Sequence, residues 1–137
     1  MNPYRRKTNY YETDQMGIIH HAHYIHWFEE ARVDFMEQMG YGYRNAMAAG
    51  LDFALLSAHC EYKSMTRFGE TVLIQTDITE LTPVRMTVTY AVTDAETGAL
   101  RVTGYTKHCY YDARKQRPVS LKKVLPDLYS LFEGTMA

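Results

Sequence analysis

Residues 9–32 read NYYETDQMGIIHHAHYIHWFEEAR and contain the pattern that decides the fold. A carboxylate, Asp14, stands just ahead of Gly17, and an aromatic-rich segment with helical spacing follows. Glycine adopts turn dihedral angles that other residues rarely reach, so the chain can reverse at Gly17 between an extended segment and a helix. The first N–H groups of a helix have no intrahelical partner and carry the positive end of the helix dipole. The pattern therefore predicts a carboxylate and free amide donors around one small volume.

That combination is typical of acyl-transfer chemistry. Such a reaction needs a base or nucleophile beside the carbonyl carbon and hydrogen-bond donors around the carbonyl oxygen. Aspartate is also common in turns and helix caps, where it only holds the backbone. In this pattern we expect Asp14 to act in catalysis, as a general base toward water or as a nucleophile that forms an acyl-enzyme anhydride. The sequence leaves these two routes open.

The segment from Glu12 to Tyr24, with residues 27–32, resembles the signature of a known enzyme family. It is similar to hotdog-fold acyl-CoA thioesterases of the 4-hydroxybenzoyl-CoA thioesterase family. In that family an aspartate, a glycine three residues later and a His or Tyr seven residues after the aspartate lead into the central helix. Here these residues are Asp14, Gly17 and His21.

The sequence also departs from the family pattern. The family often has a second aspartate where Glu12 stands, an aromatic residue where His20 stands and Asn where His23 stands. Its Pro-Ala pair before a Gly-Asp turn appears here as Met65-Thr66 ahead of Gly69-Glu70. These departures leave the preferred acyl group open between aryl and aliphatic chains.

The resemblance covers nearly all of the chain and implies its architecture. It implies an α+β hotdog fold, in which a five-stranded antiparallel sheet wraps around a central helix. We expect a single domain over residues 1–137. Hotdog proteins pair two subunits into a continuous sheet, so the resemblance implies a homo-oligomer, a tetramer or a dimer, with the active site between subunits. It implies no metal and no organic cofactor.

Hydrophobic periodicity predicts the same order of elements. Apolar residues recur at helical spacing in residues 22–39, and Gly40 stands where a helix would end. A short helical turn is expected in residues 43–49, and Pro126 begins a terminal helix through Phe132. The expected strands are residues 4–11, 51–63, 71–82, 86–92 and 100–112.

Composition and charge exclude several classes of function. The 137 residues carry a formal net charge of -1 and have a pI near 6.6, which argues against a nucleic-acid or anionic-membrane partner. The basic start of the chain is not followed by an apolar stretch, so we expect no signal peptide and a cytoplasmic enzyme. Cys60 and Cys109 fall in expected strands without metal-ligand spacing, as is typical of reduced thiols.

Other residues of the central segment have alternative interpretations. The spacing of His20, His21, His23 and His26 provides no complete metal-ligand set. By resemblance, the His21 backbone N–H would donate to the thioester carbonyl, and its imidazole could orient the substrate or Asp14. With Arg32 nearby, Glu29 and Glu30, two turns inside the helix, are expected to form ion pairs or subunit contacts, with direct catalysis as the alternative.

Substrate binding requires groups for both ends of an acyl-CoA. Tyr24 is a candidate for contact with the substrate. The pyrophosphate and ribose phosphate of CoA suit arginine. Arg85 and Arg117 lie nearest to the positions where the family places such residues. Other basic residues remain alternatives, namely Arg67, Lys107, Arg114 and Lys115.

The sequence therefore predicts an acyl-CoA thioesterase that releases a free acid and CoA. Two alternatives remain: a thioesterase acting on acyl-carrier-protein substrates, and a hotdog module that binds acyl-CoA without catalysis. The presence of Asp14 argues against the last one.

Overall fold

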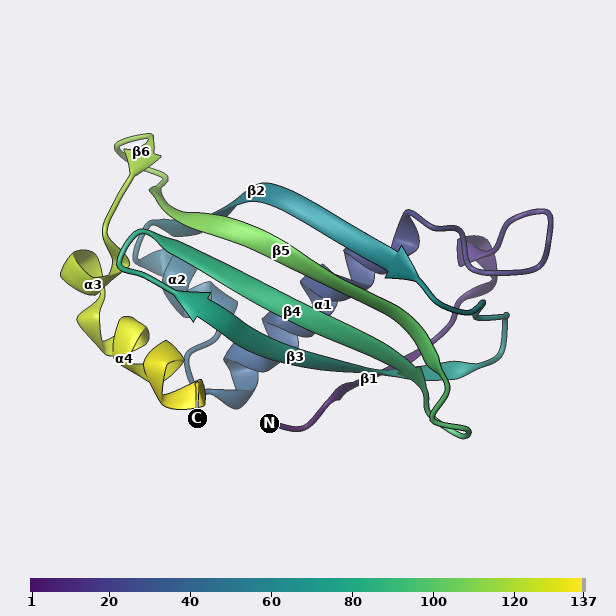
Figure 1. Cartoon of the computed structure of the whole chain (residues 1–137). Coiled ribbons are helices and arrows are strands. Elements are labelled where there is room, and N and C mark those ends of the chain that lie inside the picture. Colours follow the sequence, from purple (N-terminus) through teal and green to yellow (C-terminus); the bar gives the residue numbers. More distant parts are fainter. Residues whose placement is uncertain (137) are drawn as a thin grey trace. The chain divides into compact units, whose positions relative to one another are not determined.

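The computed structural model describes residues 1–136 and contains strands, α-helices and one 3-10 helix (Figure 1). In chain order they are β1 (Tyr4–Lys7), the 3-10 helix η1 (Tyr10–Glu12), α1 (His23–Gln38), α2 (Tyr43–Ala48), β2 (Leu51–Tyr62), β3 (Thr71–Leu81), β4 (Arg85–Asp94), β5 (Leu100–Asp112), β6 (Arg117–Pro118), α3 (Leu121–Val124) and α4 (Pro126–Thr135).

Five strands form an antiparallel sheet in the order β1-β3-β4-β5-β2, and the two-residue β6 pairs with β5 (Figure 1). The β1–β3 pair has Tyr4 opposite Ile74. Alternate residues of β3 and β4 are buried, as expected for strands with one covered face. The strand order leaves β1 and β2 at the two edges of the sheet.

Within residues 1–136 the chain divides into two compact units. The first contains residues 1–35, 59–76 and 90–104, and the second contains residues 36–58, 77–89 and 105–136. Helix α1 and strands β2 to β5 each contribute residues to both units.

The core of the first unit is built on the aromatic face of α1. Trp27 and Phe28 are fully buried. The Phe28 ring stacks on Tyr90 of β4, with 4.1 Å between centroids and 4° between planes. Gly104 of β5 makes this packing possible, because a Cβ there would lie 2.5 Å from the His59 carbonyl oxygen and 2.7 Å from the Phe28 ring. The start of α1 is therefore packed firmly against the sheet.

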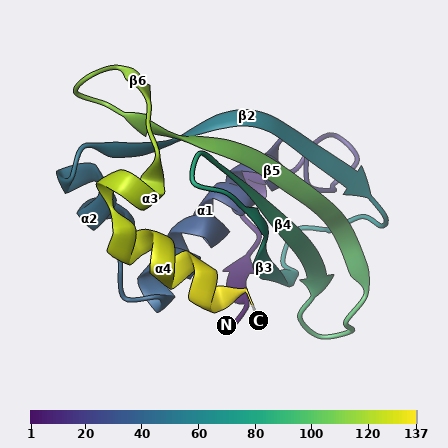
Figure 2. The same ribbon diagram turned by 60° about the vertical axis from the view of Figure 1, so that its left-hand side comes forward.

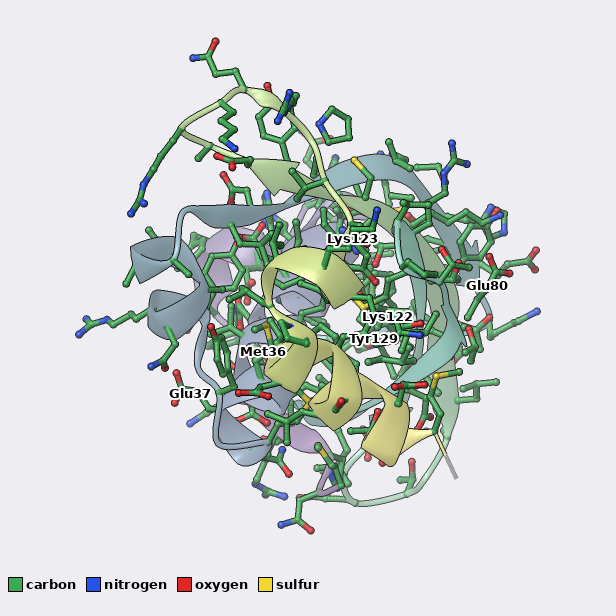
Figure 3. All side chains as sticks on the ribbon, turned by 90° about the vertical axis from the view of Figure 1, so that its left-hand side faces the viewer. Met36, Glu37, Glu80, Lys122, Lys123 and Tyr129 are labelled. Carbon is green, nitrogen blue, oxygen red and sulfur yellow. The ribbon has the colours of Figure 1, made fainter. Side chains whose placement is uncertain are left out.

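The second unit has its own aromatic core. Phe53 packs edge-on against Tyr110 and Phe132, with both centroid distances 6.1 Å. Figure 2 shows α3 running into α4, the helix that carries Phe132. The Lys122 ammonium lies 5.8 Å from the Tyr129 ring centroid, and both side chains are labelled in Figure 3.

Most of the elements expected from the sequence are confirmed. Helix α1 ends before Gly40, whose φ of 83° explains why a glycine stands there. The expected strand over residues 4–11 is wrong beyond Lys7, since residues 10–12 form a 3-10 turn. The Glu12 side chain accepts the Asn9 N–H at 2.8 Å and so stabilises the turn in place of strand pairing. Strand β6 and helix α3 were not expected from the sequence.

Among the described residues, no helix has both the length and the apolar character that a membrane span requires.

Candidate active site

Asp14 lies in a tight turn. The Gly17 N–H donates to the Asp14 carbonyl oxygen at 3.0 Å, and Gly17 has a φ of 75°. The Asp14 N–H donates to the Ile18 carbonyl oxygen at 2.9 Å, and Thr13 and Ile19 form an antiparallel bridge. The Met16 N–H donates to Oδ1 of Asp14 at 2.8 Å. The turn thus fixes both the backbone and the carboxylate orientation of Asp14, and the predicted glycine turn is confirmed.

The segment after the turn is anchored to the loop that follows β2. The Ile19 N–H donates to the Thr66 carbonyl oxygen at 2.9 Å, and Ile18 forms a bridge with Arg67. Thr66 is fully buried, and its Oγ1 accepts a hydrogen bond from the Tyr24 hydroxyl at 3.1 Å. These contacts place the start of α1 beside residues 62–67.

A buried carboxylate supports the same segment from the other side. Glu12 is 2% exposed and accepts hydrogen bonds from Nε1 of Trp27 at 2.7 Å and from two nitrogens of Arg6 at 2.6 and 2.9 Å. Burial would raise the pKa of the Glu12 carboxyl, but the hydrogen bonds from Arg6 and Trp27 hold the pKa below its usual value. The Glu12 backbone carbonyl accepts the His20 N–H at 2.8 Å.

His21 lies two residues before the first residue of α1. Its backbone N–H has no acceptor within residues 1–136, whereas its carbonyl oxygen accepts the Tyr62 hydroxyl at 3.1 Å. The exposed imidazole stacks on His20, with 4.0 Å between ring centroids. The structure therefore offers a free N–H at the positive end of a 16-residue helix.

Asp14 and His21 line a pocket in the first unit, with a volume of about 260 Å³. Its lining consists of Asp14, Ile18, Ile19, His21, Tyr24, Tyr62, Lys63, Ser64 and Met65. Ile18, Ile19 and Met65 are its apolar side chains, and the polar groups include one carboxylate and two tyrosine hydroxyls. Burial raises the pKa of Tyr24, which keeps that hydroxyl a neutral donor toward Thr66.

The structure brings together three of the five predicted site residues. Asp14, His21 and Tyr24 line the pocket. Arg85, the first residue of β4, and Arg117 of β6 are exposed and belong to the second unit, so neither shares the pocket's unit.

Three other polar residues of α1, His23, His26 and Glu30, do not line the pocket and have partners of their own. His23 and His26 contact each other, with 5.6 Å between ring centroids. Glu30 forms an ion pair with Nε of Arg6 at 3.0 Å, which confirms the expected ion pair and identifies its partner. Within residues 1–136, no three His, Cys, Asp or Glu residues are grouped so that they could hold a metal ion.

The second wall of the pocket, residues 62–65, was not expected from the sequence. These residues stand 48 or more positions after Asp14 in the chain and come from the end of β2 and the loop behind it. The available signal was the family-like turn at Gly69-Glu70, which has a φ of 89° at Gly69 and follows this wall directly. It indicated a loop near the site without indicating which of its side chains enter the pocket.

Comparison with known proteins shows the family to which the chain belongs. Residues 9–128 match the family described as the Thioesterase-like superfamily. A protein of Aquifex aeolicus that carries an esterase name is 36% identical over 106 residues, covering 77% of this chain and 81% of that protein. The acyl-CoA thioester hydrolase YbgC of Escherichia coli O157:H7 is 29% identical over 115 residues, covering 83% of this chain and 85% of that protein.

A solved structure gives the same result at the level of the fold. The DHNA-CoA thioesterase from Staphylococcus aureus superimposes with a TM-score of 0.93 at 26% sequence identity. The match covers 98% of this chain and 90% of that chain.

Proposed function

The chain belongs to the thioesterase-like superfamily and is an acyl-CoA thioester hydrolase with the hotdog fold, and from this premise we propose that Asp14 is its catalytic carboxylate. One observation carries the proposal: Asp14 and His21 line the same pocket at the start of α1. A carboxylate and a free backbone N–H are the two groups that thioester hydrolysis requires.

The carboxylate of Asp14 has one oxygen held and one available. Oδ1 accepts the Met16 N–H, and Oδ2 has no protein donor within residues 1–136. As a base, Asp14 takes a proton from water, the water oxygen adds to the carbonyl carbon, the C–S bond breaks, and the thiolate of CoA takes the proton. As a nucleophile, Asp14 bonds to the carbonyl carbon and expels the thiolate, and water then hydrolyses the anhydride.

Either route passes through a tetrahedral oxyanion. We assign its stabilisation to the His21 N–H and the positive end of the α1 dipole. An oxyanion donor held in place before the reaction is typically worth a factor of about 10² to 10³ in rate.

An isotope experiment separates the two routes. After one turnover in H₂¹⁸O with enzyme in excess, the nucleophilic route leaves ¹⁸O in the Asp14 carboxylate of every molecule in which water attacks the anhydride at the Asp14 carbon. The general-base route leaves all of the label in the released acid. Mass spectrometry of the peptide containing Asp14 reads the difference.

For the substrate, we propose that Tyr24 contacts the acyl group and that Arg85 and Arg117 bind the phosphates of CoA. Tyr24 is supported by its place in the pocket lining. The two arginines are exposed and available to phosphate oxygens. Loss of either guanidinium should raise KM for acyl-CoA and leave kcat unchanged.

A substrate panel tests the function directly. Acyl-CoA thioesters with short, long and aromatic acyl groups, together with the corresponding acyl-carrier-protein thioesters, should be ranked by kcat/KM. We expect the CoA thioesters to be hydrolysed faster. Faster turnover of the carrier-protein thioesters would favour the alternative substrate class, and binding of acyl-CoA without hydrolysis would identify a non-catalytic module.

We also propose a homo-oligomer, a dimer or tetramer, as the active form. Strand β2 lies at an edge of the sheet, and most of its residues are exposed, including Leu55 (53%) and Leu56 (50%). An exposed apolar edge strand is a template for pairing with a second copy. We propose that residues 1–137 form one domain, since α1 and four strands contribute to both compact units.

The cytoplasm is the proposed location of the enzyme. Cys60 and Cys109 are free thiols, which persist in a reducing compartment.

A further inference from the structure

Tyr62, the last residue of β2, contacts two residues of the proposed site, His21 and Tyr24. No sequence motif indicated these contacts. Its hydroxyl donates a hydrogen bond to the His21 carbonyl oxygen at 3.1 Å. Its ring lies edge-on to Tyr24, with 5.7 Å between centroids, and edge-on to the His21 imidazole at 6.5 Å. Tyr62 therefore links the edge strand to the segment that leads into α1.

The carbonyl that Tyr62 contacts is not held by the helix. Helix α1 begins at His23, so the His21 carbonyl precedes the residue whose C=O accepts the first helical hydrogen bond. Local hydrogen bonds hold the neighbouring groups, since the His20 carbonyl oxygen accepts the His23 N–H at 3.0 Å and the Ala22 N–H donates to Nδ1 of His20 at 3.2 Å, but neither of these bonds reaches the His21 carbonyl oxygen. The Tyr62 hydroxyl supplies a donor to it from a position 41 residues later in the chain.

The residue before His21 is also held by a backbone hydrogen bond. The His20 N–H donates to the Glu12 carbonyl oxygen at 2.8 Å. The His21 N–H, which has no acceptor within residues 1–136, thus lies between two anchored groups, His20 N–H before it and His21 C=O after it.

We propose that Tyr62 is a positioning residue of the oxyanion site, a role that rests on the proposed function of His21. By holding the His21 carbonyl, Tyr62 fixes the backbone orientation of His21, so that its N–H is preorganised toward the thioester oxygen. A preorganised donor stabilises the oxyanion without the cost of reorienting at the moment of reaction. Tyr62 acts through His21 and does not need to touch the reacting atoms.

Tyr62 also lines the pocket, which suggests a competing role as a direct ligand of the substrate. The two roles differ in kinetics. A hydroxyl that binds substrate equally in the ground and transition states lowers KM, whereas a group that organises the oxyanion donor raises kcat.

The test is Tyr62→Phe, which removes only the hydroxyl from a residue that is 53% exposed. We expect kcat to fall about 3- to 10-fold, the rate equivalent of one ordinary hydrogen bond, with KM, the pH profile and the melting temperature unchanged. The matched control is Tyr10→Phe, because Tyr10 is 75% exposed and its hydroxyl has no partner within residues 1–136. A kcat within twofold of wild type, or a raised KM with unchanged kcat, would overturn the proposal.

A second variant separates the backbone of His21 from its side chain. His21→Ala keeps the N–H and the carbonyl, so Tyr62→Phe should cause the same loss of kcat in that background. If the loss disappears there, Tyr62 acts through the imidazole and the proposed backbone role is wrong.

Asp14→Asn, measured in parallel, distinguishes this proposal from the proposed function. An inactive Asp14→Asn with a fully active Tyr62→Phe would refute the positioning role of Tyr62 and leave the catalytic role of Asp14 standing. A fully active Asp14→Asn with reduced kcat in Tyr62→Phe would refute the catalytic role of Asp14 and support the positioning role of Tyr62.

Discussion

Nε1 of Trp27 donates a hydrogen bond to Oε2 of Glu12 over 2.7 Å, and both side chains are buried. This bond ties the first unit's aromatic core to the turn that ends two residues before Asp14. Arg6 completes the arrangement with its guanidinium on the same carboxylate and 5.3 Å from the Trp27 ring centroid. The segment that leads to Asp14 is therefore supported by a buried carboxylate as well as by packing.

We predict that Glu12→Gln lowers the free energy of unfolding by about 1–3 kcal/mol at pH 7, because buried donors lose their charged acceptor. The pKa of Glu12 is lowered in the folded state, so its stabilising effect is present above the unfolded pKa and is lost as the pH falls through the folded value. The difference between wild type and Glu12→Gln should narrow below about pH 4.3. Urea denaturation at pH 7 and between pH 5 and about pH 3 measures it.

The control for this variant is Glu80→Gln, a change at an exposed residue labelled in Figure 3. Its free energy of unfolding should stay within about 0.5 kcal/mol of wild type. Equal effects of the two substitutions would show that the Glu12 carboxylate does not stabilise the fold.

The sequence predicted those helices and strands that have one buried face, because their apolar residues recur with the period of the element. The expected strand 100–112 coincides with β5, and the expected helix 22–39 exceeds α1 by one residue at each end. The strand expected over residues 4–11 failed because its end is decided by Glu12, whose partners Arg6 and Trp27 are set by the tertiary fold. The two-residue β6 pairs with the end of β5 across a local turn, and α3 begins at Leu121, whose N–H donates to the Pro83 carbonyl oxygen; both elements are too short to leave a periodic signal.

The candidate site was predictable on one side only. Asp14 and His21 belong to a contiguous motif, and the structure lines one pocket with both. Tyr62 lies far away in the chain, and its neighbours along β2 give no sign that its hydroxyl contacts the His21 carbonyl oxygen. Spacing within one segment predicts groups that a turn brings together, but a contact between an edge strand and a helix start requires the strand register.

Gly104→Ala should destabilise the protein by about 1–3 kcal/mol, because the new methyl group would overlap the His59 carbonyl and the Phe28 ring. The matched control is Gly134→Ala in α4, where no atom lies within 4 Å of a Cβ, and a helix interior favours alanine over glycine. Thermal unfolding should show a lowered melting temperature for the first variant and an equal or raised one for the second. A stable Gly104→Ala would contradict the described packing of Phe28.

Activity should survive exhaustive dialysis against a chelator, since the described residues form no group of three metal-binding side chains. The measurement is kcat/KM before and after treatment. A loss that one added divalent metal restores would overturn this expectation.

Light scattering should show a dimer or tetramer at micromolar concentration, because β2 leaves an exposed apolar edge. Leu56→Lys should dissociate the oligomer and abolish activity. Val84→Lys, at a similarly exposed residue (53%) between β3 and β4, should preserve both. A monomer with full activity would contradict the proposal that the oligomer is the active form.

The most direct test of the central claim is the turnover of Asp14→Asn. The carboxamide keeps the shape of the side chain and loses its basicity and nucleophilicity, so kcat should fall by at least ~100-fold while the circular dichroism spectrum and oligomeric state match wild type. Asp52→Asn, a change at an exposed residue of β2, is the control and should retain wild-type kcat. Turnover by Asp14→Asn close to that of wild type would contradict a catalytic role for Asp14.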